Sequence, residues 1–472
     1  MLKRLFDRAF GRGKTAVPPA ASTAGTLPDD VKARLEIIPR EQHIISRRNI
    51  SPNALRVLYK LRDAGFAAYL VGGAVRDLLL GGHPKDFDVA TDAHPEQVKQ
   101  LFRNCRLIGR RFRLAHVHYG PEIIEVATFR GTEDDGSGAR ELVDGRIVRD
   151  NVYGSIEEDA VRRDFTVNAL YYAVEDFSVR DYVGGYRDVQ NRVLRLIGDP
   201  DRRFREDPVR MLRAARFAAK LGFSIDPAAA AAIGRLRQLV VGAPPARLFD
   251  ECLKMFMAGH ALQSFRVLRE QKLLDALLPA TAEAVRADAG ALAMVEAALE
   301  NTDERVREGK PVTPAFLFAA LLWPAMQAAV QRREADEGDP WFPAAHEVVA
   351  EQCARIALPK RYSLPMQEIW LLQPRLDARQ RKRTTRLLAH PRFRAAYDFL
   401  VLRAHGDASL QETLAFWSAL QGGATPEVRM PAAVEAGTAG DGDAAPARKK
   451  RRRRRKPAGT KSATAISDTP DA

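Results

Sequence analysis

The 472-residue sequence is poor in cysteine and lacks long apolar stretches. Its three cysteines, Cys105, Cys252 and Cys353, lie far apart and form no CxxC pair. This spacing excludes a dense disulfide framework and a cysteine-based zinc site, and it fits a reducing, cytoplasmic compartment. No apolar run approaches the roughly 20 residues that a membrane-spanning helix needs. We therefore expect a cytoplasmic protein without integral membrane association.

Three familiar phosphate-handling motifs are also missing. The sequence contains neither a GxxxxGK[ST] loop nor a GxGxxG fingerprint, which excludes the two commonest glycine-rich nucleotide-binding loops. It has no adjacent His-Asp pair in its second half, where "AHGD" places a glycine between the two residues. This argues against an HD-type phosphatase. Any nucleotide chemistry must therefore rest on another arrangement of residues.

Positive charge is abundant and concentrated. The formal net charge is +14, and residues 448–456 form a run of nine consecutive basic residues, without which the charge falls to +5. A basic excess of this kind favours polyanionic partners, and RNA is the simplest of them. The candidate RNA-binding residues in this run are Arg448, Lys449, Lys450, Arg451 and Arg452.

The stretch "VGGAVRDLLLGGHPKDFDVAT", residues 71–91, combines a glycine turn with two aspartates. It predicts a strand, the turn at Gly72 and Gly73, a short helix, and a second strand that carries Asp86 and Asp88. Alternate side chains of a strand share one face, so the two carboxylates are expected on the same side. Carboxylates held together raise each other's pKa unless a cation neutralises them, and Mg²⁺ binds through one or two carboxylates plus substrate phosphates. Gly72, Gly73 and Arg76 are the candidate phosphate-binding residues.

This combination resembles the signature of the class II nucleotidyltransferases, which have a DNA polymerase β-like palm. The family includes tRNA CCA-adding enzymes and bacterial poly(A) polymerases. The resemblance implies a two-metal transfer of a nucleotide from an NTP to an RNA 3′-hydroxyl, with Mg²⁺ as cofactor. It also implies an α+β nucleotidyltransferase palm, a small mixed sheet with helices, followed by an all-α neck and body and a disordered basic tail.

A third carboxylate is expected beside Asp86 and Asp88, and two residues are candidates. Glu125, in "IIEVATFR", lies on a predicted strand that can pair beside the two aspartates, and we take it as a candidate metal ligand. Asp164, in "RRDFTVNAL", matches a motif whose aspartate the resembled family uses at its active site, so it is a candidate catalytic residue. Arg163 of the same motif is a candidate triphosphate ligand, since guanidinium groups bind phosphate in a bidentate manner. The sequence leaves the choice of third carboxylate open.

The stretch "REDPVRMLRAARFAAKLG" predicts a helix with Asp207 as its N-cap and Pro208 in its first turn. A capped helix with a local ion pair accounts for these residues in structural terms. The E-D-x-x-R pattern of Glu206, Asp207 and Arg210 also matches the family motif that reads the Watson–Crick edge of the incoming base. The resemblance therefore implies that Asp207 and Arg210 select the nucleotide without a nucleic-acid template.

Three further segments favour the poly(A) polymerase branch over the CCA-adding branch: "GRRFRLAHV", the extension "EIIPREQHIISRRNIS", and the helical text "HPRFRAAYDFLVLRA". The implied function is AMP transfer from ATP to RNA 3′ ends, with RNA-decay factors as possible partners. CCA addition to tRNA is the alternative, and a catalytically silent RNA-binding module is a third interpretation that the intact aspartates disfavour. The expected divisions are a disordered basic arm (1–48), the palm (49–200), a nucleotide-selecting and RNA-binding neck (201–265), an RNA-binding body (266–420) and a disordered tail (421–472).

Overall fold

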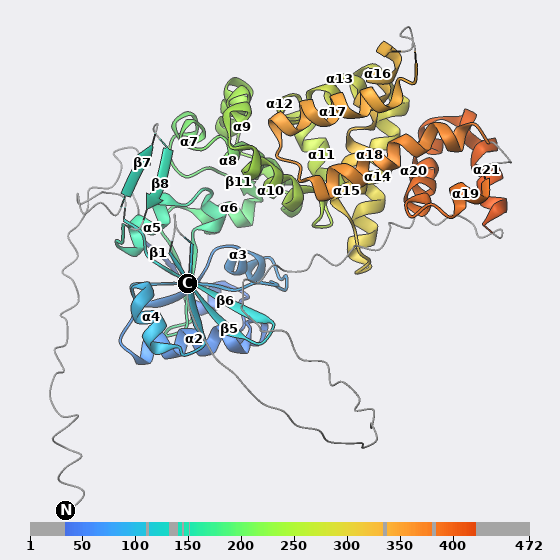
Figure 1. The fold of residues 1–472 in the computed structure, drawn as a ribbon. Coiled ribbons are helices and arrows are strands. Elements are labelled where there is room, and N and C mark those ends of the chain that lie inside the picture. The colour runs from blue at the N-terminus through green and yellow to red at the C-terminus, as the bar shows by residue number, and fades with distance from the viewer. Residues whose placement is uncertain are drawn as a thin grey trace, which may run out of the picture. The chain divides into compact units, whose positions relative to one another are not determined.

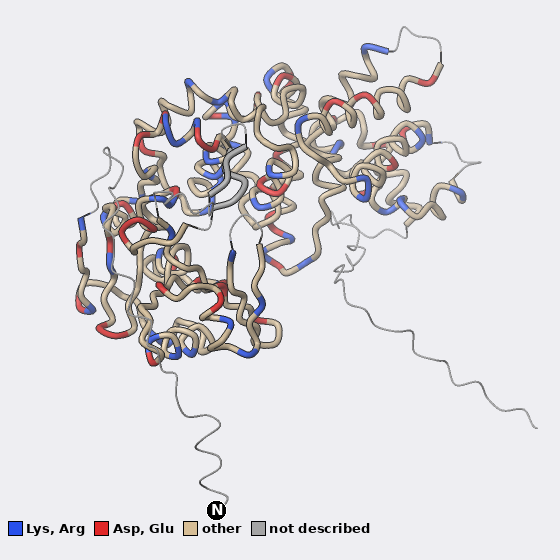
Figure 2. Tube along the Cα trace, turned by 60° about the vertical axis from the view of Figure 1, so that its left-hand side comes forward, with Lys and Arg blue, Asp and Glu red and all other residues tan. Residues whose placement is uncertain are grey.

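The computed structural model describes residues 34–109, 113–131, 140–143, 146–150, 152–333, 338–379 and 384–421, with the backbone alone for residues 140–150. The basic run at 448–456 lies outside these residues, so the predicted contacts of Arg448, Lys449, Lys450, Arg451 and Arg452 with RNA stay a prediction. Figure 2 shows lysine and arginine interspersed with aspartate and glutamate along the described chain.

An eight-stranded mixed sheet dominates the first part of the chain (Figure 1). All neighbouring strands are antiparallel except β3 and β6, which are parallel. In spatial order the strands are β1 (Glu36–Ile38), β10 (Val179–Asp181), β9 (Leu170–Ala173), β2 (Ala68–Val71), β3 (Asp88–Thr91), β6 (Glu122–Thr128), β5 (Leu114–Tyr119) and β4 (Cys105–Ile108). The β-rich runs "HVHYG" and "EIIEVATF", and likewise "LYYAV" and "FSVRDYV", predict two strand pairs, and both pairs are present.

The two faces of this sheet are covered by different elements. One face packs Leu70, Val89 and Val126 into the main core with the helix α2 (Pro52–Asp63) and with α4 (Pro95–Leu101). The other face carries a smaller cluster that includes Tyr69 and Tyr171 and extends to α5 (Ile156–Arg162). This division follows from the two-residue period of side chains along a strand. Odd and even positions of one strand therefore serve different surfaces.

Residues 34–48 correct the prediction of a disordered arm over residues 1–48. Strand β1 pairs with β10 at the edge of the sheet, and Ile38 and Ile45 are each only 1% exposed. His43 is also buried, and its Nε2 lies 2.9 Å from the carbonyl oxygen of Phe177. A three-residue strand with a distant partner is stabilised by tertiary contacts rather than by local propensity. Residues 1–33 lie outside the described part of the chain.

Outside the eight-stranded sheet, β7 (Arg140–Val143) pairs antiparallel with β8 (Arg146–Asp150). After residue 195 the described chain is helical apart from one short strand. Strand β11 (Val193–Leu194) pairs in parallel with β12 (Ser224–Ile225), a two-residue strand that the sequence pattern did not indicate. Prolines stand in the first turn of several helices, where the missing N–H costs nothing. The helices are α7 (Pro200–Glu206), α8 (Val209–Leu221), α9 (Pro227–Leu236), α10 (Pro245–Phe256), α11 (Ala261–Glu270), α12 (Leu274–Leu277), α13 (Pro279–Ala287), α14 (Ala289–Arg307), α15 (Pro314–Leu321), α16 (Trp323–Arg333), α17 (Trp341–Arg355), α18 (Lys360–Asp377), α19 (Thr384–Leu388), α20 (Phe393–Gly406) and α21 (Gln411–Leu420).

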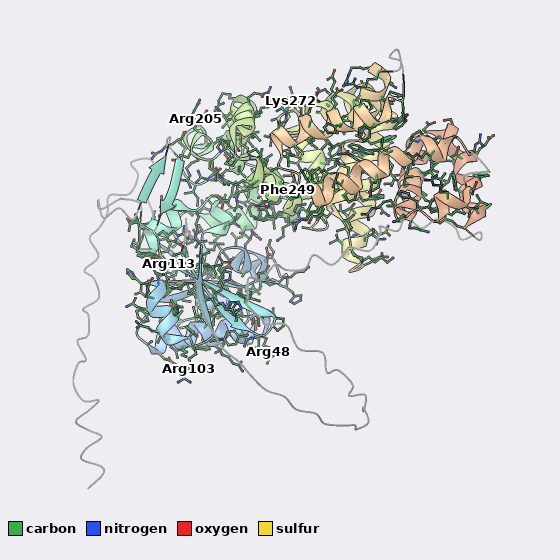
Figure 3. All side chains as sticks on the ribbon, in the orientation of Figure 1. Arg48, Arg103, Arg113, Arg205, Phe249 and Lys272 are labelled. Atoms are coloured by element: carbon green, nitrogen blue, oxygen red, sulfur yellow. The ribbon has the colours of Figure 1, made fainter. Side chains whose placement is uncertain are left out.

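Aromatic side chains hold these helices together. Phe249 of α10, labelled in Figure 3, stacks on Phe318 of α15 with ring centroids 5.9 Å apart. Trp370 of α18 is fully buried, and its indole N–H donates to the carbonyl of Ala319 at 3.0 Å. Within the described residues no single helix combines the length and apolarity of a membrane span; the bent pair α15 and α16 reaches both only when taken together.

Candidate active site

The double-glycine turn joins β2 to the short helix α3 (Gly73–Leu79). Gly72 has a φ of 75°, a left-handed conformation that glycine adopts without steric cost. Across the sheet, Val71 pairs with Asp88, so the turn begins beside the acidic strand. A Cβ at Gly72 would lie 3.6 Å from Nη1 of Arg163, which places this guanidinium against the turn. The structure therefore brings the predicted glycine turn and one predicted phosphate-binding arginine together.

The two aspartates face the same side of the sheet region, as the alternation predicts. Phe87 and Val89 are buried, whereas Asp86 and Asp88 are exposed to solvent. Strand β3 begins at Asp88, so Asp86 precedes the strand rather than lying within it. On the parallel neighbour β6, Glu125 stands in register with Asp88. Asp88 and Glu125 thus lie side by side on two adjacent strands, and Asp86 lies two residues before Asp88.

The electrostatics of this group fit a cation. Asp88 reaches solvent, yet burial and the neighbouring Glu125 raise the pKa of its carboxyl from 3.8 to about 6, with Arg163 opposing the rise and Asp86 adding to it. Burial also raises the pKa of Glu125, with Arg130 opposing this and Asp86 contributing. Burial lowers the pKa of His116, whose Nε2 is 4.0 Å from Glu125, so this ring is neutral near pH 7 and does not offset the charge.

The carboxylates of Asp86, Asp88 and Glu125 are suited to bind a divalent metal ion. Oxygen ligands with uncompensated negative charge bind hard cations such as Mg²⁺. No three His, Cys, Asp or Glu side chains in the described part of the chain already surround a common point at metal-binding distance. The carboxylates of Asp86, Asp88 and Glu125 would therefore have to draw together around the ion.

The raised pKa of Asp88, which is due to burial and to Glu125, predicts that the stability of the metal-free protein depends on pH. Because the pKa of Asp88 is about 6 when folded and 3.8 ordinarily, the folded state binds the proton more tightly. The stability that this proton provides is complete below about pH 4 and is lost as the pH rises through about 6. In EDTA, we expect the Tm of the wild type to fall relative to that of Asp88→Asn between pH 4 and pH 7. Thermal melts in EDTA across this range measure the difference.

Adding Mg²⁺ at pH 7 should raise the Tm of the wild type and leave that of Asp88→Asn unchanged. Asp92→Asn is the matched control, since Asp92 is an exposed aspartate at the other end of the same strand. It should respond to Mg²⁺ as the wild type does. An equal Mg²⁺ response in Asp88→Asn would contradict the assignment of the ion to this carboxylate.

The structure places Asp164 in an ion pair rather than among the three carboxylates. Its Oδ2 accepts from Nε and Nη2 of Arg213 in α8, at 2.8 and 2.5 Å. Its Oδ1 accepts from the backbone N–H of Phe165 and from Nδ2 of Asn168. Burial alone would raise the pKa of Asp164, but Arg213 outweighs it and holds the pKa below its ordinary value. Both oxygens are thus occupied by partners within the protein.

The two predicted phosphate-binding arginines differ in their surroundings. Arg163 donates to Asp159 at 2.9 Å and to the hydroxyl of Tyr171 at 3.0 Å, and its positive charge also acts on Asp88. Arg76 is only 2% exposed, and it donates to Asp77 and to Oδ1 of Asn168. A Cβ at Gly73 would lie 3.4 Å from Nη2 of Arg76, so this guanidinium also lies against the turn, and its contact with phosphate stays a prediction.

Of the predicted base-selecting residues, Asp207 lies between α7 and α8 and Arg210 lies in the first turn of α8, and each has a partner. Asp207 follows the last residue of α7, and its Oδ1 accepts from the N–H of Val209. The sequence predicted a helix with Pro208 in its first turn, whereas α8 begins one residue later, at Val209. Both oxygens of Asp207 accept from Arg247 of α10, at 3.1 and 2.8 Å. Arg210 donates to Glu206 at 3.0 Å, the local ion pair that the sequence allowed.

Sequence reasoning missed Arg247 and Arg213 as members of this site. Arg247 sits 40 residues beyond Asp207 in the first turn of α10, where nothing in the local pattern marks it. Arg213 lies three residues after Arg210, so the two arginines stand on neighbouring turns, but this spacing does not indicate a partner. Only the tertiary packing of α8 and α10 reveals their partners.

Comparisons with known proteins show the family to which this chain is related. A family model described as "Poly A polymerase head domain" matches residues 68–195. A model described as "Probable RNA and SrmB-binding site of polymerase A" matches residues 222–285, and "Polymerase A arginine-rich C-terminus" matches residues 334–457. The crystal structure of the Bacillus stearothermophilus CCA-adding enzyme in complex with CTP is similar, with a TM-score of 0.55 and 26% identity, over 79% of this chain and 83% of that one.

Sequence identity distinguishes the poly(A) polymerase branch of the family from the CCA-adding branch. Poly(A) polymerase I of Salmonella typhi is 51% identical over 408 residues, which cover 84% of this chain and 88% of that protein. The CCA-adding enzyme of Lactobacillus helveticus is 39% identical over 222 residues, which cover 47% of this chain and 54% of that protein. The similarity to the first extends through the helical part, and the similarity to the second spans about half of the chain. The chain therefore belongs to the poly(A) polymerase I family.

Proposed function

We propose that this protein transfers AMP from ATP to RNA 3′ ends without a template and releases pyrophosphate. The observation that carries the proposal is the 51% identity to Poly(A) polymerase I over 84% of the chain, which spans both the acidic site and the helical part. The register of Asp88 with Glu125 beside the double-glycine turn supports nucleotidyl transfer as the chemistry. CCA addition to tRNA is the alternative.

The acidic site would carry out the transfer. Asp86, Asp88 and Glu125 would hold Mg²⁺ ions, which would lower the pKa of the attacking 3′-hydroxyl and stabilise the pyrophosphate leaving group. Arg163, beside Gly72, would bind the triphosphate with its remaining N–H groups, since it lies against the turn and is 24% exposed. The backbone at Gly72 and Gly73 has no side chain to keep the phosphates away. Arg76, whose Nη2 lies against Gly73, would bind the same phosphates, while its Nη1 bonds to Asn168.

The neck would select the base. Asp207 offers acceptors and Arg210 offers donors, the complementary pair that a Watson–Crick edge requires. Both oxygens of Asp207 accept hydrogen bonds from Arg247, and Glu206 accepts one from Arg210. The side chains of Asp207 and Arg210 are therefore oriented before a nucleotide binds. Preorganised donors and acceptors discriminate between bases because a mismatched base leaves buried polar groups unpaired.

The RNA substrate would be held by sequence-independent contacts. The family description of residues 222–285 names RNA and SrmB, which favours these residues as an RNA surface and as a site for an RNA-decay partner. The basic run at 448–456 would add phosphate contacts that weaken with salt. We place this activity in the cytoplasm, where the three unpaired cysteines stay reduced.

A single-nucleotide assay tests the proposal. The full-length protein is incubated with a generic RNA, Mg²⁺ and each NTP separately. We expect long homopolymer tails with ATP and at most a few additions with CTP, GTP or UTP, because Asp207 and Arg210 are fixed for one base. Addition of two C residues and one A, restricted to tRNA ends, would instead establish the alternative.

A further inference from the structure

A cavity of about 500 Å³ lies on the sheet region, away from the acidic site. It is bordered by the segment that precedes α2, by α2 itself and by the turn between β9 and β10. Its volume falls within the roughly 300–1,000 Å³ of typical small-molecule sites. The polar and aromatic residues of its wall are Arg40, Ser46, Arg47, Arg48, Tyr59, Tyr172 and Phe177.

The cavity and the acidic site lie on opposite faces of the sheet. Tyr171 and Tyr172 are consecutive in β9, so their side chains point to opposite faces. The hydroxyl of Tyr171 donates to Asp159 at 2.7 Å and accepts from Arg163, on the nucleotide side. Tyr172 belongs to the core on the α2 side and lines the cavity. A ligand in the cavity would therefore be separate from a nucleotide bound for transfer.

The arginines of the cavity hold positive charge that no carboxylate neutralises directly. Nη1 of Arg47 donates to the hydroxyl of Tyr59 at 3.0 Å, and Nη1 of Arg40 donates to the carbonyl of His43 at 2.8 Å. Arg48, labelled in Figure 3, is exposed at the surface of the sheet region. Within the described chain, Arg40, Arg47 and Arg48 form no ion pair with an acidic side chain. Guanidinium groups without a carboxylate partner favour an anionic ligand, and phosphate above all.

The wall of the cavity also includes aromatic rings, and one of them belongs to a residue with an unusual backbone conformation. Phe177 has a φ of 60°, which is rare for a bulky residue. Its carbonyl contacts His43, and the guanidinium carbon of Arg47 lies 4.6 Å from its ring centroid. Strained backbone of this kind concentrates at ligand-binding sites. The strain here fixes an aromatic ring and a stacked guanidinium at the edge of the cavity.

We propose that this cavity binds a nucleoside phosphate unit. The rings of Tyr59 and Phe177 and the guanidinium of Arg47 would stack with the base, and Arg40 and Arg48 would bind the phosphate. Such a unit has two sources, a free adenosine nucleotide or one residue of an RNA strand whose 3′ end lies elsewhere on the enzyme. The proposal does not depend on the proposed AMP transfer, because the two sites lie on opposite faces.

Photo-crosslinking to the full-length protein tests this proposal. The probes are 8-azidoadenosine 5′-monophosphate and a short oligoadenylate with one internal 8-azidoadenosine, and the adducts are located by mass spectrometry of peptides. We expect an adduct on the peptides that contain Tyr59, Tyr172 or Phe177. An adduct from the oligoadenylate alone identifies RNA as the source, and one from the monophosphate alone identifies the free nucleotide.

Two double variants of equal charge provide the comparison. Arg40→Ala with Arg48→Ala should lower the yield of the cavity adduct about tenfold, the loss expected for two charge-assisted phosphate contacts. If RNA is the source, it should also reduce the salt slope of RNA binding by about 1.4, at roughly 0.7 per contact with a single strand. Arg56→Ala with Arg103→Ala removes two exposed arginines outside the cavity and should leave the adduct intact.

AMP addition at saturating RNA, measured in parallel, separates this proposal from the proposed function. It should stay at the wild-type level in both double variants, whatever the adduct does. Absence of a cavity adduct with both probes, or an equal loss of the adduct in the two double variants, would overturn the proposal.

Discussion

Asp88→Asn is expected to slow AMP addition at least about a thousandfold while RNA affinity stays within twofold of the wild type. Loss of a group that stabilises developing charge in a transition state typically costs about 10²–10³ in rate, and loss of a metal ion adds to this. The variant keeps the shape of the residue and removes a charge that Glu125 and Asp86 repel, so the fold should gain rather than lose stability. Asp86→Ala should abolish incorporation in the same way. Rates come from single-nucleotide addition, and affinity comes from fluorescence anisotropy of labelled RNA.

The control for this prediction is Asp92→Asn. It removes an exposed aspartate from the other end of the same strand, so it matches the change in charge and in local sequence. It should retain near-wild-type activity. Activity of Asp88→Asn within tenfold of the wild type would refute the metal-binding role of the acidic strand, because a metal site cannot lose a central carboxylate at so small a cost.

The sheet face that carries this chemistry could be predicted from the sequence because its signals are local. Phe87 and Val89 alternate with Asp86 and Asp88, and a two-residue period decides which side chains turn toward solvent. The paired strands around residues 114–128 and 170–181 follow from β-rich runs separated by turns. Nothing beyond neighbouring residues was needed for either prediction.

The errors share a physical cause, which is dependence on distant partners. Strand β1 is only three residues long and is stabilised by β10, far along the chain, so no local pattern distinguishes it from a disordered arm. The orientation of Asp164 depends on Arg213, and the orientation of Asp207 depends on Arg247. Charged side chains have several partners within reach in any sequence, and only tertiary packing chooses among them.

The second large effect concerns Asp164, whose role decides which residue is the third carboxylate. Asp164→Ala should lower the free energy of unfolding by about 3 kcal/mol, because it leaves Arg213 without its ion-pair partner. Since Arg213 holds the pKa of Asp164 below its ordinary value, this stability is complete above about pH 4 and is lost as the pH falls further. Urea unfolding at pH 7 and near pH 3 measures both statements, and the variant should differ from the wild type less at the lower pH.

A comparison of two carboxylates then assigns the metal ligand. If Asp164 positions the "RRDF" motif against α8, Asp164→Ala and Arg213→Ala should lose stability and activity to similar extents, and the double variant should be little worse than either. Their Mg²⁺ requirement should equal that of the wild type. Glu125→Gln should instead keep its stability and need several-fold more Mg²⁺ for half-maximal activity, because Glu125 stands in register with Asp88. An increased Mg²⁺ requirement in Asp164→Ala but not in Arg213→Ala would make Asp164 a metal ligand, and the ion pair seen here would then have to break before each transfer.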